Sequence, residues 1–596
     1  MSFFSKEVKV SPRILPPIII LQSFIYLFSV SFSRWGNILV DTFRDPLIAT
    51  KILNGSVLYR DILYEYGILP PYLLAAFVGL LGNHLAVFVF YGIILTLAFS
   101  VALYRISRLF LDRVVSTVLV VNFLFVFAFG QYCYHGIFNF ILPYSFASTT
   151  FIVFTIYALY FFLKFLLTQR KNYLFAWAIF MFFAFSCRIL LPLLVWGAFL
   201  ISGLVYAIKN RKEWKIVFIL FAPIIFALVG YSVFMIFTGS FSGFKEAIID
   251  HILATKNSSF VAEIMGLTDF KNSCANIAQS FIFYIVFIAL ALFTCWITPF
   301  FSCGRKAFYF LLPLVLIGFV VIEQVMGVIA VRSFQFLPMQ IFLIIGAVVS
   351  LIGIFRLNHP KWMVLFALCL VSLALLIRVI FHITAHHYGF YLVPISLAAY
   401  YIFFFKGFDV ILKRYFPDVP RRFFSFVLIF ICAMSALSWW RVSHSLYLSR
   451  NLVMRDGDNV VTVQEDMLNF RTLSAIVYLL KNTPRDATVV VVPEGAGINY
   501  LSKRMNPMRH VSFTPALFSI VDEKDVIGDF IKSSADYVVI VQRITSEHGA
   551  SRFGLDYGTD LFKWIMKNYS SEKVIGPFPF TSNEFGVAIL KNNNMQ

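Results

Sequence analysis

Charged residues are scarce in this chain of 596 residues. They make up 13% of the sequence, whereas 60% of the residues are hydrophobic and the mean hydropathy is +0.83. Water-soluble domains carry about 25% charged and about 45–50% apolar residues. The shortage of charge therefore excludes a single water-soluble core, a coiled coil, a collagen-like fibre and a disordered tail protein. It indicates a multi-pass membrane protein.

Acidic residues are scarcer than basic ones, with 30 Asp and Glu against 49 Lys and Arg, which gives a formal charge of +19. An excess of this size is also found in proteins that bind nucleic acid. Here, however, the basic residues stand in short clusters between apolar runs, a pattern typical of loops on one side of a membrane. We therefore expect membrane lipids, and no nucleic acid, among the partners.

Cysteine is rare and scattered, and the sequence contains no CxxC spacing, internal repeat of fixed period or low-complexity tract. This excludes a disulfide framework and a zinc site of the usual spacing. The seven cysteines are Cys133, Cys187, Cys274, Cys295, Cys303, Cys369 and Cys432.

Long apolar runs dominate what remains. A helix needs about 20 residues to cross roughly 30 Å of hydrocarbon, and about thirteen runs approach that length. They lie at 14–32, 84–104, 114–130, 143–167, 173–187, 189–208, 216–238, 277–300, 307–329, 335–355, 362–381, 388–405 and 423–441. The first run lacks a small-residue cleavage site, so we interpret it as a retained helix and not as a signal peptide.

Basic residues are concentrated in alternate loops, which predicts a cytoplasmic N-terminus and, after an odd number of crossings, an external C-terminus. The loops on the expected cytoplasmic side contain Arg105, Arg108 and Arg113, Arg170 and Lys171, Lys209 to Lys215, Arg305 and Lys306, Arg356 and Lys361, and Lys406 to Arg422.

The composition changes to that of a soluble domain near Asp456. We therefore divide the chain into a membrane domain, 1–455, and an external domain, 456–596. In the external domain, predicted helices at 464–482, 523–534 and 556–570 alternate with β-branched runs at 487–495, 535–543 and 585–591. This alternation is typical of an α/β domain. Two further external segments, 33–83 and 239–276, are too long and polar to be simple turns, and long loops are usually functional.

The segment 33–83 concentrates acidic side chains in a protein that has few of them, namely Asp41, Asp45, Asp61 and Glu65. Carboxylates just above a membrane helix can deprotonate a hydroxyl nucleophile or hold a metal ion. The alternative is that they are solvated loop charges, because structural charges outnumber catalytic ones. The spacing alone leaves both interpretations open.

Three segments carry a resemblance to a known family: NGSVLYRDILYEYGILPPYLLAAFVGLLG after the first acids, FNFILPYSFA at 138–147, and VVVVPEGAGINYLSKRMNPMRHVSFTPALF in the tail. They are similar to bacterial members of the GT-C superfamily of integral-membrane glycosyltransferases, in the branch of protein O-mannosyltransferases and lipid A aminoarabinose transferases. The first segment departs from the usual pattern at Ile68, where Pro is common.

The resemblance implies a GT-C fold and transfer of a sugar from a polyprenyl-phosphate donor to a glycan, lipid or protein acceptor at the external face of the membrane. It places the protein in the bacterial inner membrane, and it matches Asp41 to the catalytic loop aspartate. Asp45 is a second catalytic candidate, at a position where many relatives have Glu. The resemblance names no certain cofactor and leaves a divalent metal open.

The expected sugar transfer requires a general base for the acceptor and cations near the leaving phosphate. An acceptor hydroxyl must lose its proton as the bond from C1 to phosphate breaks, and the leaving phosphate needs positive charge nearby. Charges at the ends of apolar runs are expensive and so are functional candidates, with snorkelling to the interface as the alternative. The candidates are Arg188, Arg332, Arg378, His382, His386 and His387, and we add Tyr59, Arg60 and Asp61 as substrate-binding candidates, with Asp61 expected to pair with a neighbouring arginine.

Two other classes of protein fit the helix count. A flippase or other transporter should show inverted repeats, which are absent from the sequence. A polysaccharide ligase or polymerase would centre on Arg and His in a late loop and would leave the acidic first loop unexplained. We expect the tail to assist acceptor binding or stability without supplying a catalytic group. Glu494 follows a predicted strand, which leaves a binding site in the tail open, but a turn is the commoner explanation.

Overall fold

The computed structural model describes residues 14–133, 139–210, 213–255, 259–281, 336, 338–357, 359–385, 388–415 and 421–595. Among the candidate residues, Arg332, His386 and His387 lie outside this part of the chain. The same is true of the predicted span 307–329 and of most of 277–300.

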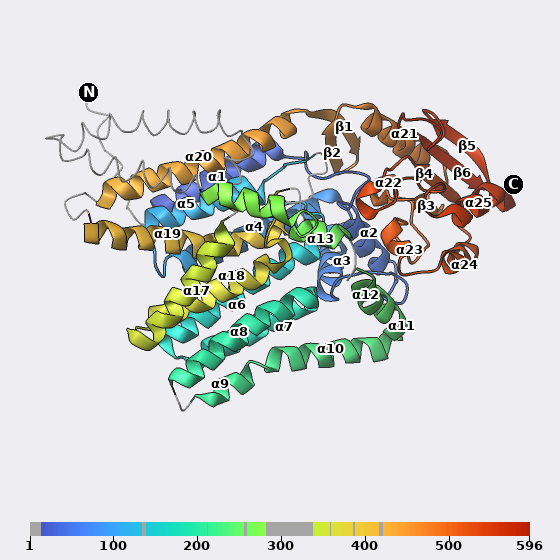
Figure 1. Cartoon of the computed structure of the whole chain (residues 1–596). Helices are drawn as coiled ribbons and strands as arrows, with labels where there is room; N and C mark the ends of the chain where they lie inside the picture. The colour runs from blue at the N-terminus through green and yellow to red at the C-terminus, as the bar shows by residue number, and fades with distance from the viewer. Residues whose placement is uncertain are drawn as a thin grey trace, which may run out of the picture.

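Long apolar helices form a bundle that occupies most of the molecule (Figure 1). All the predicted spans within the described residues correspond to helices. They are α1 (Leu15–Ser31), α4 (Leu85–Ser107), α5 with η1 (Arg113–Phe123, Leu124–Ala128), α6 (Phe146–Thr168), α7 (Lys171–Cys187), α8 (Leu190–Lys209), α9 with α10 (Trp214–Ile219, Ala222–Thr238), α17 (Met339–Arg356), α18 with η4 (Pro360–Leu376, Ile377–Val379), η5 with α19 (Phe390–Leu392, Val393–Tyr415) and α20 (Arg421–Leu448).

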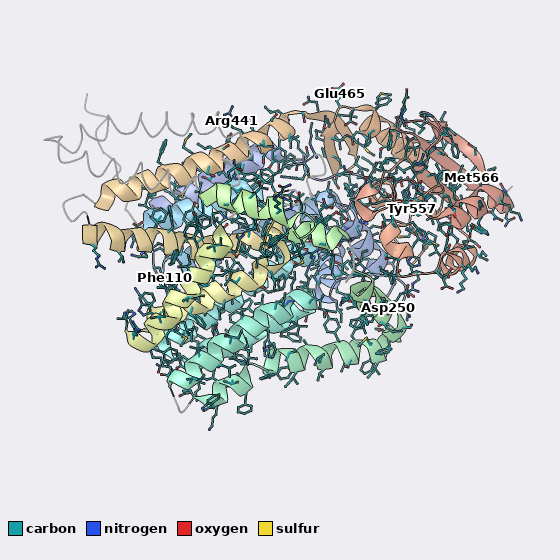
Figure 2. The ribbon with its side chains drawn as sticks, viewed as in Figure 1. Phe110, Asp250, Arg441, Glu465, Tyr557 and Met566 are labelled. Atoms are coloured by element: carbon teal, nitrogen blue, oxygen red, sulfur yellow. The ribbon has the colours of Figure 1, made fainter. Side chains whose placement is uncertain are left out.

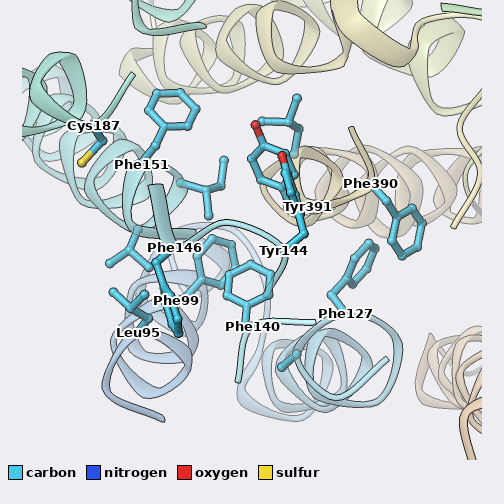
Figure 3. Packing of buried hydrophobic residues seen from close by; sticks show 14 of the residues in the cluster. Leu95, Phe99, Phe127, Phe140, Tyr144, Phe146, Phe151, Cys187, Phe390 and Tyr391 are labelled. Atoms are coloured by element: carbon cyan, nitrogen blue, oxygen red, sulfur yellow. The ribbon is translucent and has the colours of Figure 1, made fainter. Parts of the chain in front are cut away.

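Seven helical segments in the described residues are long and apolar enough to cross a membrane, so the chain is an integral membrane protein. Large apolar side chains on α10, such as Ile236 and Phe237, are exposed where lipid would cover them. The interior is packed with aromatic rings, as in the pair Phe99 and Phe123, whose centroids are 4.5 Å apart. Figure 3 shows Tyr144 and Tyr391 next to each other within this core, with centroids 6.1 Å apart.

The first external segment is more ordered than a loop. It contains α2 (Arg44–Leu53) and the apolar α3 (Leu69–Leu81), which the sequence analysis did not predict. Prolines at the start of α3 suit the first helical turn, where backbone amides have no partner. The second external segment contains α11 (Phe241–Phe244), η2 (Lys245–Asp250), α12 (His251–Thr255) and α13 (Ser259–Met265). In Figure 1, α2, α3, α11 and α12 lie between the bundle and the C-terminal part of the chain.

The C-terminal part contains a hairpin and a mixed sheet. The hairpin is β1 (Arg450–Asp456) with β2 (Asn459–Gln464), and the sheet has the order β3-β4-β6-β5, with β3 and β4 parallel and the other pairs antiparallel. Its elements are α21 (Met467–Asn482), β3 (Val489–Val492), α22 (Ala496–Ser502), α23 (Pro515–Phe518), α24 (Glu523–Ser533), β4 (Tyr537–Val541), η6 (Ser546–His548), α25 (Thr559–Asn568), β5 (Tyr569–Ile575), β6 (Val587–Asn592) and η7 (Asn593–Met595).

Two predicted helix boundaries in this region were wrong. The helix predicted at 464–482 begins at Met467, because Gln464 completes β2 and the side chain of Asp466 caps the helix by accepting from the Asn469 amide. The helix predicted at 556–570 ends at Asn568. Tyr569 is instead the first residue of β5, paired with Asn592 of β6. Tertiary pairing overrides local helix propensity at this position.

An Arg-rich loop lies at one end of the helix bundle and the C-terminal domain at the other. Figure 2 places Phe110, in the Arg-rich loop between α4 and α5, away from the C-terminal domain that carries Tyr557 and Met566. This arrangement is compatible with a basic cytoplasmic side and an external tail. The orientation of the chain in the membrane stays a prediction.

Candidate active site

Asp41 lies in a tight turn that the preceding residues build. The Asn37 side-chain oxygen accepts hydrogen bonds from the amides of Leu39 and Val40, and Asp41 itself has a left-handed backbone with φ of 54°. Aspartate tolerates this conformation better than most residues. Its carboxylate, 13% exposed, accepts a hydrogen bond of 2.9 Å from the Tyr388 hydroxyl. Burial raises the pKa of Asp41, and Arg44 and Tyr388 oppose that rise.

Arg44, the first residue of α2, lies among three carboxylates. Its guanidinium is 2.5 Å from Glu65 and 3.9 Å from both Asp41 and Asp45. Burial alone would raise the pKa of Glu65, but the close Arg44 cation holds it below its usual value. The buried Nε and Nη2 of Arg44 have no hydrogen-bond partner among the described residues. The guanidinium therefore keeps donors for a further acceptor.

Asp45 is buried and both of its oxygens are engaged by the protein. One accepts a hydrogen bond of 2.6 Å from the Phe146 amide at the start of α6, and the other accepts one of 3.3 Å from the Tyr64 hydroxyl. Burial raises the pKa of Asp45 to about 6. A helix N-terminus favours a carboxylate, so this contact ties α2 to the bundle.

Arg188 lies at the break between α7 and α8 and is 6% exposed. Its guanidinium is 4.2 Å from the centroid of the Tyr66 ring and 5.5 Å from that of Tyr391, and it donates to the hydroxyls of Tyr144 and Ser148. No carboxylate of the described residues lies within ion-pair distance of it, and its buried Nε has no partner there. A buried cation without a counter-charge is costly, which suggests an anionic ligand.

The first external segment reaches Arg188 through Gly67. The Gly67 amide donates to the Cys187 carbonyl at 2.9 Å, and a Cβ at this position would come within 2.2 Å of the Ser186 carbonyl oxygen. Only glycine allows this approach. Because Tyr66 immediately precedes it, Arg44 and Arg188 both come close to the Tyr66 ring, at 5.2 and 4.2 Å from its centroid.

The other sequence candidates are placed differently. Arg378 lies close enough to Tyr391 to act on it electrostatically, on the side of the site where Arg188 also lies. Arg60 and Asp61 form an ion pair of 2.9 Å at the surface, which confirms the expected pairing of Asp61 with a neighbouring arginine. Tyr59 is buried and donates to the Tyr66 carbonyl. These contacts hold the loop, and the substrate-binding role expected for the three residues stays a prediction.

Sequence reasoning missed one carboxyl group of the site. Glu494, from the tail, is 13% exposed, and the Nε of Arg543 donates to it at 3.4 Å. Burial and the charge of Asp41 raise the pKa of Glu494 to about 7, while Arg543 opposes the rise. No sequence signal could pair residues so far apart, although the PEG segment that carries Glu494 belongs to the family resemblance.

The carboxylates do not fit a metal site. Among the described residues, no group of three or more His, Cys, Asp or Glu side chains could hold an ion. Arg44 stands between Asp41, Asp45 and Glu65, in the place that a cation would need. The positive charge of this cluster is supplied by the protein.

No protein family and no curated protein matches the sequence. The structure is similar to that of ArnT from Cupriavidus metallidurans in the apo state, with a TM-score of 0.53, 10% identity and coverage of 97% of this chain and 98% of that one. For ArnT bound to undecaprenyl phosphate the TM-score is 0.51, with 10% identity and 97% of each chain covered.

A more distant likeness is to the oligosaccharyltransferase AglB from Archaeoglobus fulgidus in complex with an inhibitory peptide and a dolichol-phosphate. Its TM-score is 0.47 at 13% identity, over 98% of this chain and 75% of that one. The ArnT comparisons extend over nearly the whole of both chains and confirm the fold expected from the resemblance. This protein therefore has the same fold as ArnT, the GT-C fold expected from the resemblance.

Proposed function

We propose that the protein is a glycosyltransferase that moves one sugar from a polyprenyl-phosphate donor to an acceptor at the external face of the membrane. One observation carries the proposal: Arg188 is buried without a carboxylate partner among the described residues, against the Tyr66 ring of the acidic first segment. A lipid phosphate supplies the missing negative charge and oxygen acceptors. The ArnT structure with undecaprenyl phosphate supports this class of ligand.

The proposed step uses groups of the first segment. Asp41 takes the proton of the acceptor hydroxyl, the freed oxygen forms a bond to C1 of the sugar, and the bond from C1 to phosphate breaks with its electron pair leaving on the phosphate. The phosphate gains one negative charge, and Arg188 and Arg44 stabilise it with donors already in place. Displacement of this kind inverts the anomeric centre. Asp45 positions α2 and takes no proton, because both of its oxygens are bound.

The identity of the donor, the class of acceptor and the location in the bacterial inner membrane are also parts of this proposal. Undecaprenyl phosphate is the expected carrier because the sequence resembles bacterial relatives. A flippase would bind such a lipid without transferring its sugar, so binding and transfer must be measured separately.

The test is the Arg188→Gln variant. Hydrogen bonds to charged groups contribute about 1.5–3 kcal/mol, so its affinity for undecaprenyl phosphate should fall by at least about tenfold. Binding is measured in detergent by quenching of the intrinsic tryptophan fluorescence. Arg356→Gln is the control, because Arg356 is exposed at the end of α17. Equal affinity in both variants, or wild-type protein that releases no sugar from any undecaprenyl-phosphate sugar, would contradict the proposal.

A further inference from the structure

The turn that carries Glu494 is docked on the backbone that leads to Asp41. We call Pro493, Glu494 and Gly495 the PEG turn; it joins β3 to α22. The Gly497 amide, two residues beyond the turn, donates to the Ile38 carbonyl at 3.1 Å, and a Cβ on Gly497 would come within 2.2 Å of that oxygen. A Cβ on Gly495 would lie 3.7 Å from a methyl of Leu39. The tail thus contacts the first segment just before its catalytic candidate.

Further contacts hold the tail in place against the first external segment. The ammonium of Lys51 on α2 is buried and donates to the carbonyls of Asn506 and Met508, and the Leu63 amide donates to the Arg509 carbonyl at 2.9 Å. The rings of Phe43 and Tyr500 pack at 5.7 Å. Because backbone and buried side chains both take part, the position of the PEG turn relative to Asp41 is fixed.

The Glu494 carboxyl is only partly used by the protein. Among the described residues, Arg543 is the one side chain that donates a hydrogen bond to it, at 3.4 Å, and Arg543 also pairs with Glu547. The carboxyl keeps an exposed portion of 13%. By contrast, both oxygens of Asp45 accept hydrogen bonds, from the Phe146 amide and the Tyr64 hydroxyl. Glu494 therefore has acceptor or donor capacity left for a ligand.

The charges around Glu494 favour its protonated form. Asp41 and Glu494 repel each other when both are ionised, and Asp41 has the better support for its charge, from Tyr388 and Arg44. Burial and the Asp41 charge bring the pKa of Glu494 to about 7. The groups that face this pair are Arg44, Glu65, Tyr388, Arg543, Glu547, His548 and Tyr557.

We propose that Glu494, supplied by the C-terminal domain, is the acceptor-positioning residue of the transfer site and hydrogen-bonds an oxygen of the acceptor beside Asp41. The proposal rests on the proposed function. In its protonated form the carboxyl donates to the acceptor, while ionised Asp41 receives the proton of the attacking hydroxyl. The acceptor is therefore a molecule with at least two neighbouring oxygens, as in a sugar. It specifies the expectation that the tail assists acceptor binding without supplying a catalytic group.

The experiment uses the full chain with undecaprenyl phosphate carrying radiolabelled mannose, glucose, galactose or arabinose, and envelope glycolipid and glycan as acceptors. Glu494→Gln keeps a hydrogen-bond donor but cannot titrate, whereas Glu494→Leu loses the donor. The matched control is Glu584→Gln, which removes an exposed glutamate that pairs with Arg471 at 3.2 Å in the same domain. Binding of undecaprenyl phosphate reports whether each variant is folded.

In wild-type protein, transfer should decline as pH rises through about 7, because Glu494 loses its proton. Glu494→Gln should remove this decline and keep kcat within about threefold at pH of about 6. Glu494→Leu should raise the acceptor KM by at least about tenfold with a smaller change in kcat. If Glu494→Leu does not bind undecaprenyl phosphate, it is not folded and its KM is not used. The pH profile of Glu494→Gln then tests the proposal by itself.

Three results would overturn the proposal in different ways. An unchanged alkaline decline in Glu494→Gln with an unchanged acceptor KM in Glu494→Leu would remove Glu494 from the site and leave the transferase function standing. A fall of at least about 10² in kcat at every pH in Glu494→Gln would make Glu494 the base instead. Wild-type protein that transfers none of the sugars would overturn both the proposed function and this role.

Discussion

At the scale of single residues, Arg44 and Arg188 differ in the groups that surround their positive charges. Three carboxylates balance the positive charge of Arg44, and Arg44 helps to hold them in place. Arg188 instead contacts aromatic rings and hydroxyls. An arginine on an aromatic face keeps its full charge, because the ring adds no negative ion. Arg188 is therefore the better partner for a phosphate, and Arg44 the better organiser of the acids.

Asp41 and Asp45 are expected to respond differently to the same substitution. Asp41→Asn keeps the size of the side chain but cannot accept a proton, so transfer should fall by at least about 10² while undecaprenyl phosphate still binds. Asp45→Asn keeps an acceptor for the Phe146 amide and should lower transfer less. Labelled-sugar transfer measured beside lipid binding checks this, with Asp560→Asn on α25, where the side chain is 66% exposed, as the surface control. Near-normal transfer in Asp41→Asn together with no transfer in Asp45→Asn would identify Asp45 as the base in place of Asp41.

At the scale of elements, α2 and α22 form the contact on which the site is assembled. They belong to opposite ends of the chain, and the Phe43 and Tyr500 rings and the bond from the Gly497 amide to Ile38 join them. Neither helix is long enough to be stable alone, so each depends on this packing. A shift of α22 would move the PEG turn away from Asp41.

Gly497→Ala tests this contact. The added Cβ would meet the Ile38 carbonyl at 2.2 Å, and the two backbones must separate. Because misplacement by about 1 Å can cost about 10² in rate, we expect transfer to fall by between about tenfold and that amount. Gly528→Ala on α24 is the control, since no atom lies within 4 Å of its Cβ. Equal rates for the two variants, measured at equal protein amounts, would show that the α22 contact does not position the site.

At the scale of the whole molecule, three segments meet over one end of the bundle. The first external segment, the second and the tail are joined there, for example by the half-buried ion pair of Arg509 with Glu246 at 2.8 Å. The basic loop near Phe110 lies at the other end (Figure 2). Within the described residues, α2 and the tail lie on the side opposite this loop (Figures 1 and 2).

The orientation predicts the outcome of reporter fusions. Alkaline phosphatase fused after Gln596 should be active, because the tail is expected outside the cytoplasm. The same enzyme fused after Gln169, beside Arg170 and Lys171, should be inactive, since basic loops stay inside. Green fluorescent protein at the two positions should give the reverse pattern. Inactive phosphatase together with fluorescence at Gln596 would reverse the topology and place the acids on the cytoplasmic side.

Much of the architecture was predictable from the chain. Within the described residues, hydropathy located the long apolar helices but not the shorter α3, because crossing hydrocarbon is a property of one segment of sufficient length. Alternation of helices and β-branched runs gave the tail its α/β character. The structure also showed what local patterns miss: α2 and α3 inside a presumed loop, the hairpin of β1 and β2, and the strand β5 that follows α25 directly.

The sequence by itself determined the membrane class of the protein, the acidic character of the first external segment and the choice of Asp41 within it. These follow from composition, charge placement and a motif, all of which are local. Only the tertiary structure decided that Arg188 is buried against Tyr66, that Asp45 is tied to α6, and that Glu494 lies near Asp41. The reason is physical: burial and electrostatic interaction depend on which distant segments share a small volume, and that volume exists only after folding.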